Sequence, residues 1–422
     1  MARILFTTFG SWGDLHPYIA IGLALQARGH QVTIGASATY GPKVNAEGLA
    51  FHPVRPDVSL DDRAMIAYFF DVRQGSKRVV SSVISVVRES YEDTLPAARE
   101  ADLVVSHPLT FAAVIAAQKL GKPWVSSVLA PISFLSAYDP PVVAPAPWLV
   151  KLRVFGPGLM KRIWDVGRRE AMSWTGPLTE LRRELGLGPI ANPIFEGAHS
   201  PNLVLALFSK CIGHPQPDWP PHTIVTGFPF YDRHHEHPDL SPALESFLAA
   251  GPPPIVFTLG TSAVATAGDF YRDSLNAVQR IGARAVFLTG SHPQGLPDQL
   301  PPSVLAVSYA PHSEVFPRAA AIVHQGGVGT TAQAMRAGRP MLVVPFAHDQ
   351  FDNAARVKRL GIAEVLERGR YNARRAASRL EKLLQSASHA EAAAKVGGRV
   401  QAEDGAHAAA DAMESVLQRV AT

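Results

Sequence analysis

The chain has 422 residues, a length that predicts two domains, each large enough to bury its own core. Its composition, 47% hydrophobic and 18% charged, is typical of an ordinary globular protein. The 40 Lys and Arg exceed the 36 Asp and Glu by only four and form no single block, which argues against a nucleic-acid partner. The single cysteine, Cys211, cannot form an internal disulfide, so nothing in the sequence indicates an oxidising compartment or a thiolate metal site.

The sequence predicts a cytoplasmic protein with no integral membrane segment. The start of the chain runs from Arg3 through a short apolar stretch into a Gly-rich turn, without the cleavage site of a signal peptide. Three prolines interrupt the long uncharged stretch, residues 246–268, which makes it a poor membrane span.

Short apolar runs alternate with helical patterns, which predicts an α/β protein with parallel sheets covered by helices. The first unit has a strand at 3–9, a helix that opens at Pro17 and closes at Gly29, and a strand at 31–37. A similar strand that runs into a turn of small residues recurs at 255–260. Strands are then expected at 285–288, 304–308, 321–324 and 341–345, with helices at 269–281, from 330, from 351 and through the Ala-rich tail from 374.

Residues 213–254 are rich in proline and read as a connection and its flanks, so we place a domain boundary near residue 217. The expected domains are residues 1–216 and 217–400. Residues 401–422 are expected to form a helix that packs back toward the first domain.

The loop after the expected strand at 321–324 has the residues of a phosphate-binding site. Gly326, Gly327 and Gly329 let the backbone approach an anion, and the following helix start supplies free N–H groups and a positive dipole end. His324 and Thr330 are candidates for additional hydrogen bonds. A tight, capped strand-to-helix turn is the alternative. The loop has neither the Lys of a Walker A motif nor the G-x-G-x-x-G spacing of a dinucleotide site.

Polar residues also follow the next expected strand, where Asp349 and Gln350 come directly after 341–345. Because the carboxyl ends of neighbouring parallel strands share one edge, these side chains are expected to reach groups attached to the diphosphate. In the first half, the loop at residues 10–17 holds two candidate bases, Asp14 and His16. The alternative role for Asp14 is to cap the following helix.

Residues 309–350 resemble the donor-binding box of the family 1 nucleotide-sugar glycosyltransferases, whose bacterial members often carry a His-x-Gly-Gly-x-Gly-Thr-Thr run like that at 324–331. The resemblance implies the GT-B fold, with two Rossmann-like doubly wound domains facing across a cleft. It implies that Tyr309 and His312 flank the nucleotide base. It assigns the diphosphate to Ser262, His324, Gly329 and Thr330, and the sugar hydroxyls to Asp349 and Gln350.

One departure from the family concerns the ribose. Many members have Glu where this chain has Gln333, and a neutral amide is a weaker partner for the ribose diol. We interpret this as a preference for a thymidine donor. Residues 345–354 look like bacterial rhamnosyltransferases that act on hydroxy-fatty acids, polyketides or phenolics, so dTDP-L-rhamnose is the first expected donor and UDP-glucose the second.

The resemblance also assigns the catalytic base. Several bacterial and sterol-modifying members have an Asp in a Gly-Asp-x-x-Pro pattern, which corresponds here to Asp14. Plant members pair a His at this position with an Asp at the end of a later strand, and His107 stands there in this chain. We therefore expect Asp14 and His107 to share a proton, with either as the acceptor. The alternative for His107 is an ordinary polar strand end.

No metal is expected, because the histidines within 234–237 lie in the presumed linker and no Asp-x-Asp pair follows a strand. The implied reaction is an inverting displacement onto a hydroxyl of a hydrophobic molecule such as a flavonoid or other phenolic, a polyketide or a hydroxy-fatty acid. Apolar stretches at 64–70, 128–138 and 142–164 suit such an acceptor. A nucleotide-sugar epimerase and a non-catalytic sugar-nucleotide-binding subunit remain as alternatives.

Overall fold

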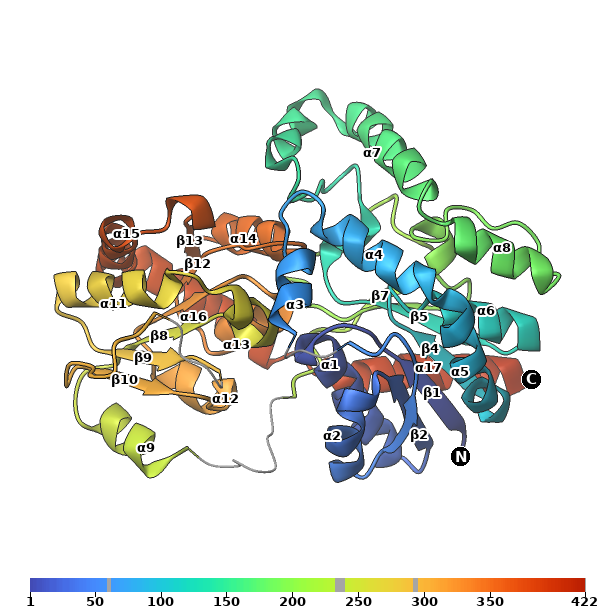
Figure 1. Cartoon of the computed structure of the whole chain (residues 1–422), viewed down its shortest axis with the longest axis horizontal. Coiled ribbons are helices and arrows are strands. Elements are labelled where there is room, and N and C mark those ends of the chain that lie inside the picture. The colour runs from blue at the N-terminus through green and yellow to red at the C-terminus, as the bar shows by residue number, and fades with distance from the viewer. Residues whose placement is uncertain (59–61, 232–239, 291–294, 422) are drawn as a thin grey trace. The chain divides into compact units, whose positions relative to one another are not determined.

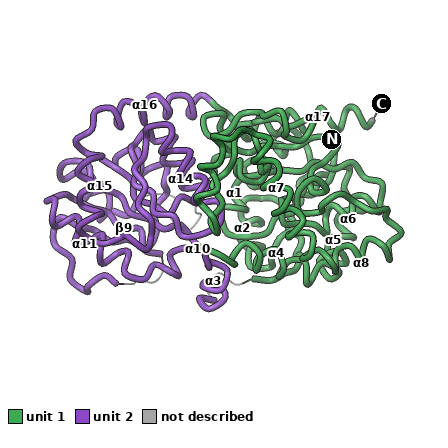
Figure 2. The backbone as a smooth tube through the Cα atoms, turned by 90° about the horizontal axis from the view of Figure 1, so that it is seen from above, with its two compact units in different colours: residues 1–59, 73–231, 403–422 green, residues 60–72, 232–402 purple. Residues whose placement is uncertain are grey.

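The computed structural model describes residues 1–58, 62–231, 240–290 and 295–421, and the chain divides into two compact units (Figure 2). Unit 1 comprises residues 1–59, 73–231 and 403–422, and unit 2 comprises 60–72 and 232–402. Each unit has one parallel sheet covered by helices (Figure 1), so the expected α/β class is confirmed. The main passage from unit 1 to unit 2 follows Tyr231, whereas the sequence placed the boundary near residue 217.

The sheet of unit 1 has seven strands in the order β3-β2-β1-β4-β5-β6-β7, all parallel. Its strands are β1 (Arg3–Thr7), β2 (Gln31–Ala36), β3 (Ala50–Pro53), β4 (Leu103–Ser106), β5 (Trp124–Val128), β6 (Val204–Ala206) and β7 (Thr223–Val225). The strand order reverses between β1 and β4, where Thr7 lies opposite Ser106.

The helices of unit 1 follow the alternation that the sequence predicts. They are α1 (Trp12–Gln26), α2 (Gly41–Ala46), α4 (Gly75–Ser85), α5 (Val87–Glu100), α6 (Phe111–Leu120), α7 (Pro157–Met172), α8 (Gly176–Glu184) and α17 (Gly405–Ala421), with 3-10 turns η1 (Ala38–Tyr40), η2 (Pro131–Phe134), η3 (Pro147–Phe155) and η4 (Glu196–Ala198). The C-terminal helix α17 packs against α1, and Arg28 holds it through Asp411 at 2.6 Å and Glu414 at 2.7 Å.

The expected start of the first helix is wrong. Helix α1 begins at Trp12, and Pro17 lies inside it. The reason is a capping box: the Ser11 hydroxyl accepts the Gly13 N–H, and the Asp14 carboxylate accepts the Ser11 N–H at 2.6 Å. These bonds satisfy amide groups that the first turn would otherwise leave unpaired, so the helix starts five residues before the proline.

The sheet of unit 2 has six parallel strands in the order β10-β9-β8-β11-β12-β13. They are β8 (Ile255–Thr258), β9 (Ala285–Leu288), β10 (Val304–Val307), β11 (Ala321–His324), β12 (Met341–Val343) and β13 (Ala363–Val365). The helices are α3 (Arg63–Phe69), α9 (Pro242–Ala249), α10 (Gly260–Ala263), α11 (Phe270–Ile281), α12 (His312–Val315), α13 (Val328–Arg336), α14 (Gln350–Arg359), α15 (Ala373–Gln385) and α16 (Ala387–Gln401), with 3-10 turns η5 (Val264–Thr266), η6 (Phe316–Arg318) and η7 (Arg368–Arg370).

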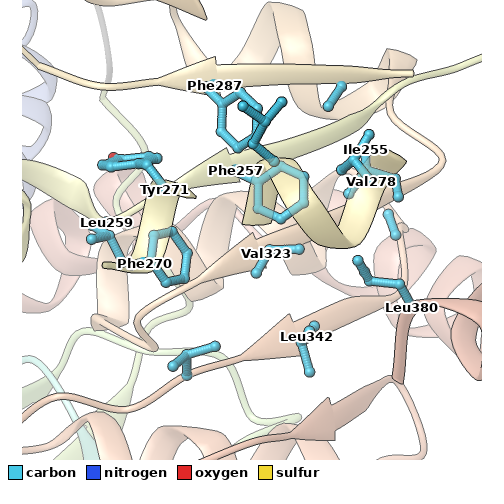
Figure 3. Close-up of a cluster of buried hydrophobic side chains, with 14 of the residues drawn as sticks. Ile255, Phe257, Leu259, Phe270, Tyr271, Val278, Phe287, Val323, Leu342 and Leu380 are labelled. Atoms are coloured by element: carbon cyan, nitrogen blue, oxygen red, sulfur yellow. The ribbon is translucent and has the colours of Figure 1, made fainter. Parts of the chain in front are cut away.

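The core of unit 2 fixes the strands that carry its loops. The rings of Phe257 on β8 and Phe287 on β9 stack with centroids 4.8 Å apart, and Tyr271 and Val278 of α11 cover them (Figure 3). Each fully buried side chain of this size contributes about 2 to 3 kcal/mol. The strands are buried on both faces, as parallel strands between helices are, so their ends are held firmly where β8 and β11 lie side by side.

Candidate active site

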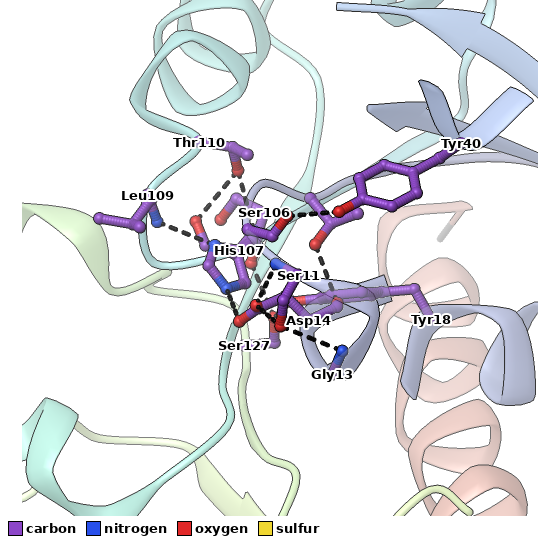
Figure 4. A network of polar contacts seen from close by, with 12 residues as sticks. Ser11, Gly13, Asp14, Tyr18, Tyr40, Ser106, His107, Leu109, Thr110 and Ser127 are labelled. Atoms are coloured by element: carbon purple, nitrogen blue, oxygen red, sulfur yellow. Dashed lines mark hydrogen bonds and ion pairs between the residues drawn. The ribbon is translucent and has the colours of Figure 1, made fainter. Parts of the chain in front are cut away.

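Asp14 and His107 meet at the reversal point of the first sheet (Figure 4). Asp14 lies in the first turn of α1, which follows β1, and His107 directly follows the neighbouring strand β4. His107 Nε2 is 3.4 Å from Asp14 Oδ1. In open parallel sheets, ligands bind outside the carboxyl ends of the strands at such a reversal point.

The hydrogen bonds of His107 define how the pair is used. His107 Nδ1 accepts the Leu109 N–H at 3.2 Å, so a neutral ring carries its proton on Nε2, which faces the carboxylate. The His107 side chain is 5% exposed and that of Asp14 is 30% exposed. Asp14 is therefore the accessible member of the pair, and the buried ring orients it.

Ser11 holds the other carboxylate oxygen, and Gly10 leaves the space that this oxygen occupies. Asp14 Oδ2 accepts the Ser11 N–H at 2.6 Å and the Ser11 hydroxyl at 3.0 Å. Gly10 has a φ of +134°, and a Cβ at this position would lie 2.3 Å from Asp14 Oδ2. The Tyr40 hydroxyl donates to the Gly10 carbonyl at 2.5 Å. The Ser-x-x-Asp spacing of a capping box could have identified Ser11, but no local pattern identifies Tyr40, which lies 30 residues away.

Two buried tyrosines surround the pair. Burial raises the pKa of Tyr18, whose hydroxyl bonds to Ser127 Oγ at 2.7 Å, and the negative charge of Asp14 raises it further. Burial and the charge of Asp14 also raise the pKa of Tyr40. Both phenols therefore stay protonated and act as hydrogen-bond groups beside Asp14 and His107. His16, the other predicted base, contacts the rings of Trp12 and Tyr231, with centroids 6.0 and 5.1 Å apart.

The predicted phosphate loop lies at the reversal point of the second sheet, between β11 and α13. Gly327 caps α13, so the helix starts two residues before the expected Thr330. Gly326 has a φ of +90°, and a Cβ there would be 2.8 Å from Val343 Cγ1. At Gly329 a Cβ would meet no atom within 4 Å, so the first turn of the helix is open above this residue. The Thr330 side chain is mostly buried beside it.

His324 shapes this loop from inside the core. Its side chain is completely buried, Nδ1 accepts the Gly326 N–H at 3.1 Å, and Nε2 lies 3.4 Å from Met341 Sδ. Burial, together with the nearby His312, lowers the pKa of His324 to about 3, so the ring is neutral. A direct contact with a diphosphate requires this ring to turn out of the core.

Gln325 lies between the loops that follow β8 and β11, and sequence reasoning missed it. A Cβ on Gly260 would lie 2.5 Å from Gln325 Nε2, and a Cβ on Gly327 would lie 2.8 Å from it. The Gln325 side chain is only 7% exposed, yet among the described residues its Oε1 is one of the buried atoms without a hydrogen-bond partner, as is Thr331 Oγ1. Buried polar atoms are normally paired, so both positions are unusual. Gln325 Oε1 can only accept a hydrogen bond, so the group of this side chain suited to a phosphate is Nε2, which lies beside Gly260 and Gly327.

The residues after β12 connect to the same loop. Asn353 Nδ2 donates to the Gly326 carbonyl at 2.9 Å and to Asp349 Oδ2 at 2.8 Å, so one amide joins the phosphate loop to the predicted sugar-binding carboxylate. Gln350 Oε1 accepts the N–H groups of Phe346 and Ala347, which leaves its amide nitrogen for a ligand. No local pattern in the sequence singled out Asn353.

The other predicted donor residues lie around this edge of unit 2. Gln333 is on α13 and is 7% exposed, Tyr309 follows β10 and is 39% exposed, and the His312 ring stacks on Phe316 with centroids 4.3 Å apart. Ser262 belongs to α10, but its side chain is outside the described part of the structure. The histidines at 234, 235 and 237 are also outside it.

A segment from the first half of the sequence completes this edge. Residues 60–72 belong to unit 2, where α3 packs against η5 and Phe70 packs on the core (purple in Figure 2). The Phe70 ring meets the ring of His348 edge-on, with centroids 5.3 Å apart, and His348 has a φ of 55°. His348 immediately precedes Asp349, so this contact supports the predicted sugar-binding turn.

Two further observations concern metals and membranes. Within residues 1–58, 62–231, 240–290 and 295–421, no group of three or more His, Cys, Asp and Glu side chains is placed to hold a metal ion. In the same ranges, no helix has the length and apolar character needed to cross a bilayer.

Comparisons with known proteins agree with this geometry. Residues 4–126 match the family model "Glycosyltransferase family 28 N-terminal domain", and residues 273–414 match "Erythromycin biosynthesis protein CIII-like, C-terminal domain". The O-mycaminosyltylonolide 6-deoxyallosyltransferase of Streptomyces fradiae is 33% identical over 96% of this chain and 94% of its own length. A sterol 3-beta-glucosyltransferase of Aspergillus clavatus is 26% identical over the whole chain, which covers 30% of that protein.

A solved structure shares the fold over almost the whole chain. The spinosyn rhamnosyltransferase SpnG, complexed with thymidine diphosphate, superposes with a TM-score of 0.70 at 18% identity, covering 98% of this chain and 100% of that one. The expected GT-B fold is thus confirmed. The extended match to the Streptomyces enzyme shows that this chain is an enzyme that transfers a sugar and belongs to the family 1 nucleotide-sugar glycosyltransferases of natural-product type.

Proposed function

We propose that this chain is an inverting O-glycosyltransferase that moves a hexose from a dTDP-sugar to a hydroxyl of a hydrophobic small molecule. The observation that carries the proposal is the Asp14–His107 pair, in which a buried neutral ring orients a partly exposed carboxylate. A phenolic compound such as a flavonoid, a polyketide or a hydroxy-fatty acid is the acceptor class. The single free cysteine fits a reducing compartment, and we place the enzyme in the cytoplasm.

Asp14 is the proton acceptor in this scheme. The acceptor O–H gives its proton to Asp14 while its oxygen forms a bond to the anomeric carbon. The bond between that carbon and the β-phosphate oxygen breaks, and the electron pair leaves with dTDP. Attack opposite the leaving group inverts the anomeric configuration. The Nε2–H of His107 donates to Asp14 Oδ1 and keeps the carboxylate in the orientation that accepts the proton.

Unit 2 supplies the leaving-group stabilisation. The N-terminus of α13 carries a positive dipole end, and in this scheme its first N–H groups, next to Gly327 and Gly329, receive the departing phosphate. Thr330 and the amide of Gln325 add neutral donors at the same edge. We therefore propose that the reaction needs no metal ion, and that turnover persists in chelator.

The thymidine donor is supported by Gln333, which is a weaker partner than Glu for the 2'-hydroxyl of a ribose. The structural relative SpnG, a spinosyn rhamnosyltransferase complexed with thymidine diphosphate, supports dTDP-L-rhamnose as the first donor to test. The match to a sterol 3-beta-glucosyltransferase favours UDP-glucose as the second candidate.

The test combines nucleotide binding with turnover. Calorimetric titration in chelator-containing buffer is expected to show tighter binding of dTDP than of UDP. Transfer from dTDP-rhamnose to an acceptor panel is then compared between the unaltered chain and Asp14→Asn, which is expected to lower turnover about 10²- to 10⁴-fold and to leave dTDP affinity unchanged.

Asp404→Asn is a matched control, because Asp404 also caps a helix and pairs with a histidine, His407, at 2.9 Å. This change is expected to leave turnover intact. Tighter binding of UDP would shift the donor to the second candidate. Binding of neither nucleotide, or equal losses in both Asp variants, would contradict the proposal.

A further inference from the structure

The hairpin formed by η3 and α7 has its own small core in unit 1. Met160 and Trp164 are buried, and Leu149, Leu152 and Ile163 pack against them. In Figure 1, α7 and the preceding segment, drawn in green, stand away from the sheet of unit 1. The hairpin therefore has an inner face that packs on its own small core and an outer face that is exposed.

Four large apolar side chains of the hairpin are highly exposed. Val154 is 78% exposed, Phe155 is 70% exposed, Val166 is 66% exposed and Trp148 is 58% exposed. Among the described residues, only Met1 is a more exposed large hydrophobic residue than these four. Apolar surface concentrated in one place on a protein marks an interaction site more often than scattered residues do.

The first part of the hairpin, up to Trp164, has basic but no acidic residues. Residues 140–164 contain no Asp or Glu but four cations, Lys151, Arg153, Lys161 and Arg162, a local excess that the sequence analysis did not single out. All four side chains are exposed, and in the described ranges none of them forms an ion pair with a carboxylate. Asp139 and Asp165 flank this range in the sequence, and Asp165 pairs with Arg168 at 3.3 Å.

We infer that the tip of this hairpin, residues 148–155, docks on the surface of an anionic lipid bilayer. Trp148, Val154 and Phe155 supply an apolar wedge for the boundary between headgroups and acyl chains, where Trp is favoured. Lys151 and Arg153 lie between them in the sequence and complement negative headgroups. A protein with an apolar patch and an acidic rim would match the same surface, and vesicle binding distinguishes that partner from a bilayer. The inference concerns a surface of unit 1 and does not depend on the donor. The stretch 142–164, expected to suit the acceptor, includes this surface, so the test separates lipid docking from acceptor binding.

The test is co-sedimentation of the full chain with vesicles of phosphatidylglycerol and phosphatidylcholine, compared with phosphatidylcholine alone. Binding is expected to the anionic vesicles, to weaken with salt, and to be nearly absent with the neutral ones. The double change Val154→Ser with Phe155→Ser is expected to reduce the affinity at least tenfold. The control is Ile224→Ser with Val420→Ser, which removes two exposed apolar residues elsewhere in unit 1 and is expected to bind normally.

Charge is tested separately. Lys151→Gln with Arg153→Gln is expected to weaken binding about fivefold for each cation removed. The control, Arg280→Gln with Lys395→Gln, removes the same charge from exposed positions of unit 2 and is expected to retain most of the affinity.

Three results overturn the inference. The first is no binding to anionic vesicles at low salt, and the second is binding that the tip variants leave unchanged. The third is a tip variant that retains vesicle binding but loses another property. A raised KM for the acceptor would assign the tip to acceptor binding, and loss of self-association would assign it to contact with a second copy of the chain. Turnover with soluble acceptors reports on the reaction separately, so failure of either proposal is seen independently.

Discussion

Replacing Gly10 with alanine tests whether the position of the Asp14 carboxylate, and not only its presence, supports turnover. The alanine Cβ would lie 2.3 Å from Asp14 Oδ2 and 2.6 Å from its Cγ, well inside van der Waals contact. The carboxylate must therefore move, and it then loses the Ser11 N–H bond of 2.6 Å and its 3.4 Å approach to His107 Nε2. We expect turnover to fall about 10²- to 10⁴-fold, the range that a misplaced general base costs.

Backbone strain alone must be separated from this effect. Gly10 has a φ of +134°, and an alanine in such a region costs about 1 to 3 kcal/mol of stability. Gly29 has a φ of +87°, and a Cβ there would meet no atom within 4 Å. Gly29→Ala therefore carries a similar backbone cost without touching Asp14, and it is expected to retain turnover.

The assay measures turnover at saturating donor, dTDP affinity by calorimetry and the free energy of unfolding for both variants. Gly10→Ala is expected to lose turnover while dTDP binding, a property of unit 2, stays within twofold. If Gly10→Ala and Gly29→Ala turn over at similar rates while both fold, the placement of the Asp14 carboxylate does not control the reaction and the reasoning is refuted.

Three further changes address unit 2. Gln325→Leu keeps the side-chain volume and removes the donor Nε2 beside Gly260 and Gly327, so the dTDP affinity should fall about tenfold. Because the change also removes a buried Oε1 that has no partner, the free energy of unfolding should stay constant or rise, and loss of stability with unchanged affinity would assign Gln325 to the core. Gln333→Glu should raise the affinity for UDP relative to dTDP about tenfold in calorimetry, because a carboxylate can accept hydrogen bonds from both hydroxyls of a ribose. An unchanged ratio of the two affinities would count against the donor assignment. Burial lowers the pKa of His324 to about 3, so below about pH 6.5 the unfolded chain binds a proton that the folded chain excludes, and the free energy of unfolding should fall by about 1 kcal/mol per pH unit. Urea unfolding between pH 7 and 5 should show a shallower dependence for His324→Asn, whose Oδ1 can still accept the Gly326 N–H, and an equal slope would contradict a buried neutral ring.

The features that the sequence predicted are those with a local signal. The strand at Ala321–His324 is a continuous apolar run, and the glycines after it have few uses other than a sharp turn or a close approach. The polar residues after β12 also follow a recognisable strand, and the parallel arrangement of the strands places them beside the loop. Asp14 and His107 were predicted to meet only because the family resemblance aligned two strand ends about 90 residues apart, and the structure brings their side chains together.

The features that the sequence missed depend on contacts between distant segments. Tyr40 reaches Gly10 from η1, and Asn353 reaches Gly326 from α14, so neither has a local pattern. The start of α1 was missed for a different reason: Pro17 is a strong local signal, but the Ser11–Asp14 capping box outweighs it. The capping box therefore explains both where α1 starts and why the candidate base has a fixed orientation. The capping role and the catalytic role of Asp14 are therefore not alternatives.

The two candidate sites follow one rule of sheet topology. Each lies where the strand order reverses, between β1 and β4 in unit 1 and between β8 and β11 in unit 2. At such a point the connections from the two neighbouring strands leave on opposite sides of the sheet. The space beyond the carboxyl ends of these strands therefore stays free. The chain places a carboxylate with its histidine at the first point, and glycines with a helix N-terminus at the second. One suits removal of a proton and the other suits an anion. Since each set is held by bonds within its own unit, changes at Gly10 should alter turnover without altering nucleotide affinity, and changes at Gln325 should alter nucleotide affinity first.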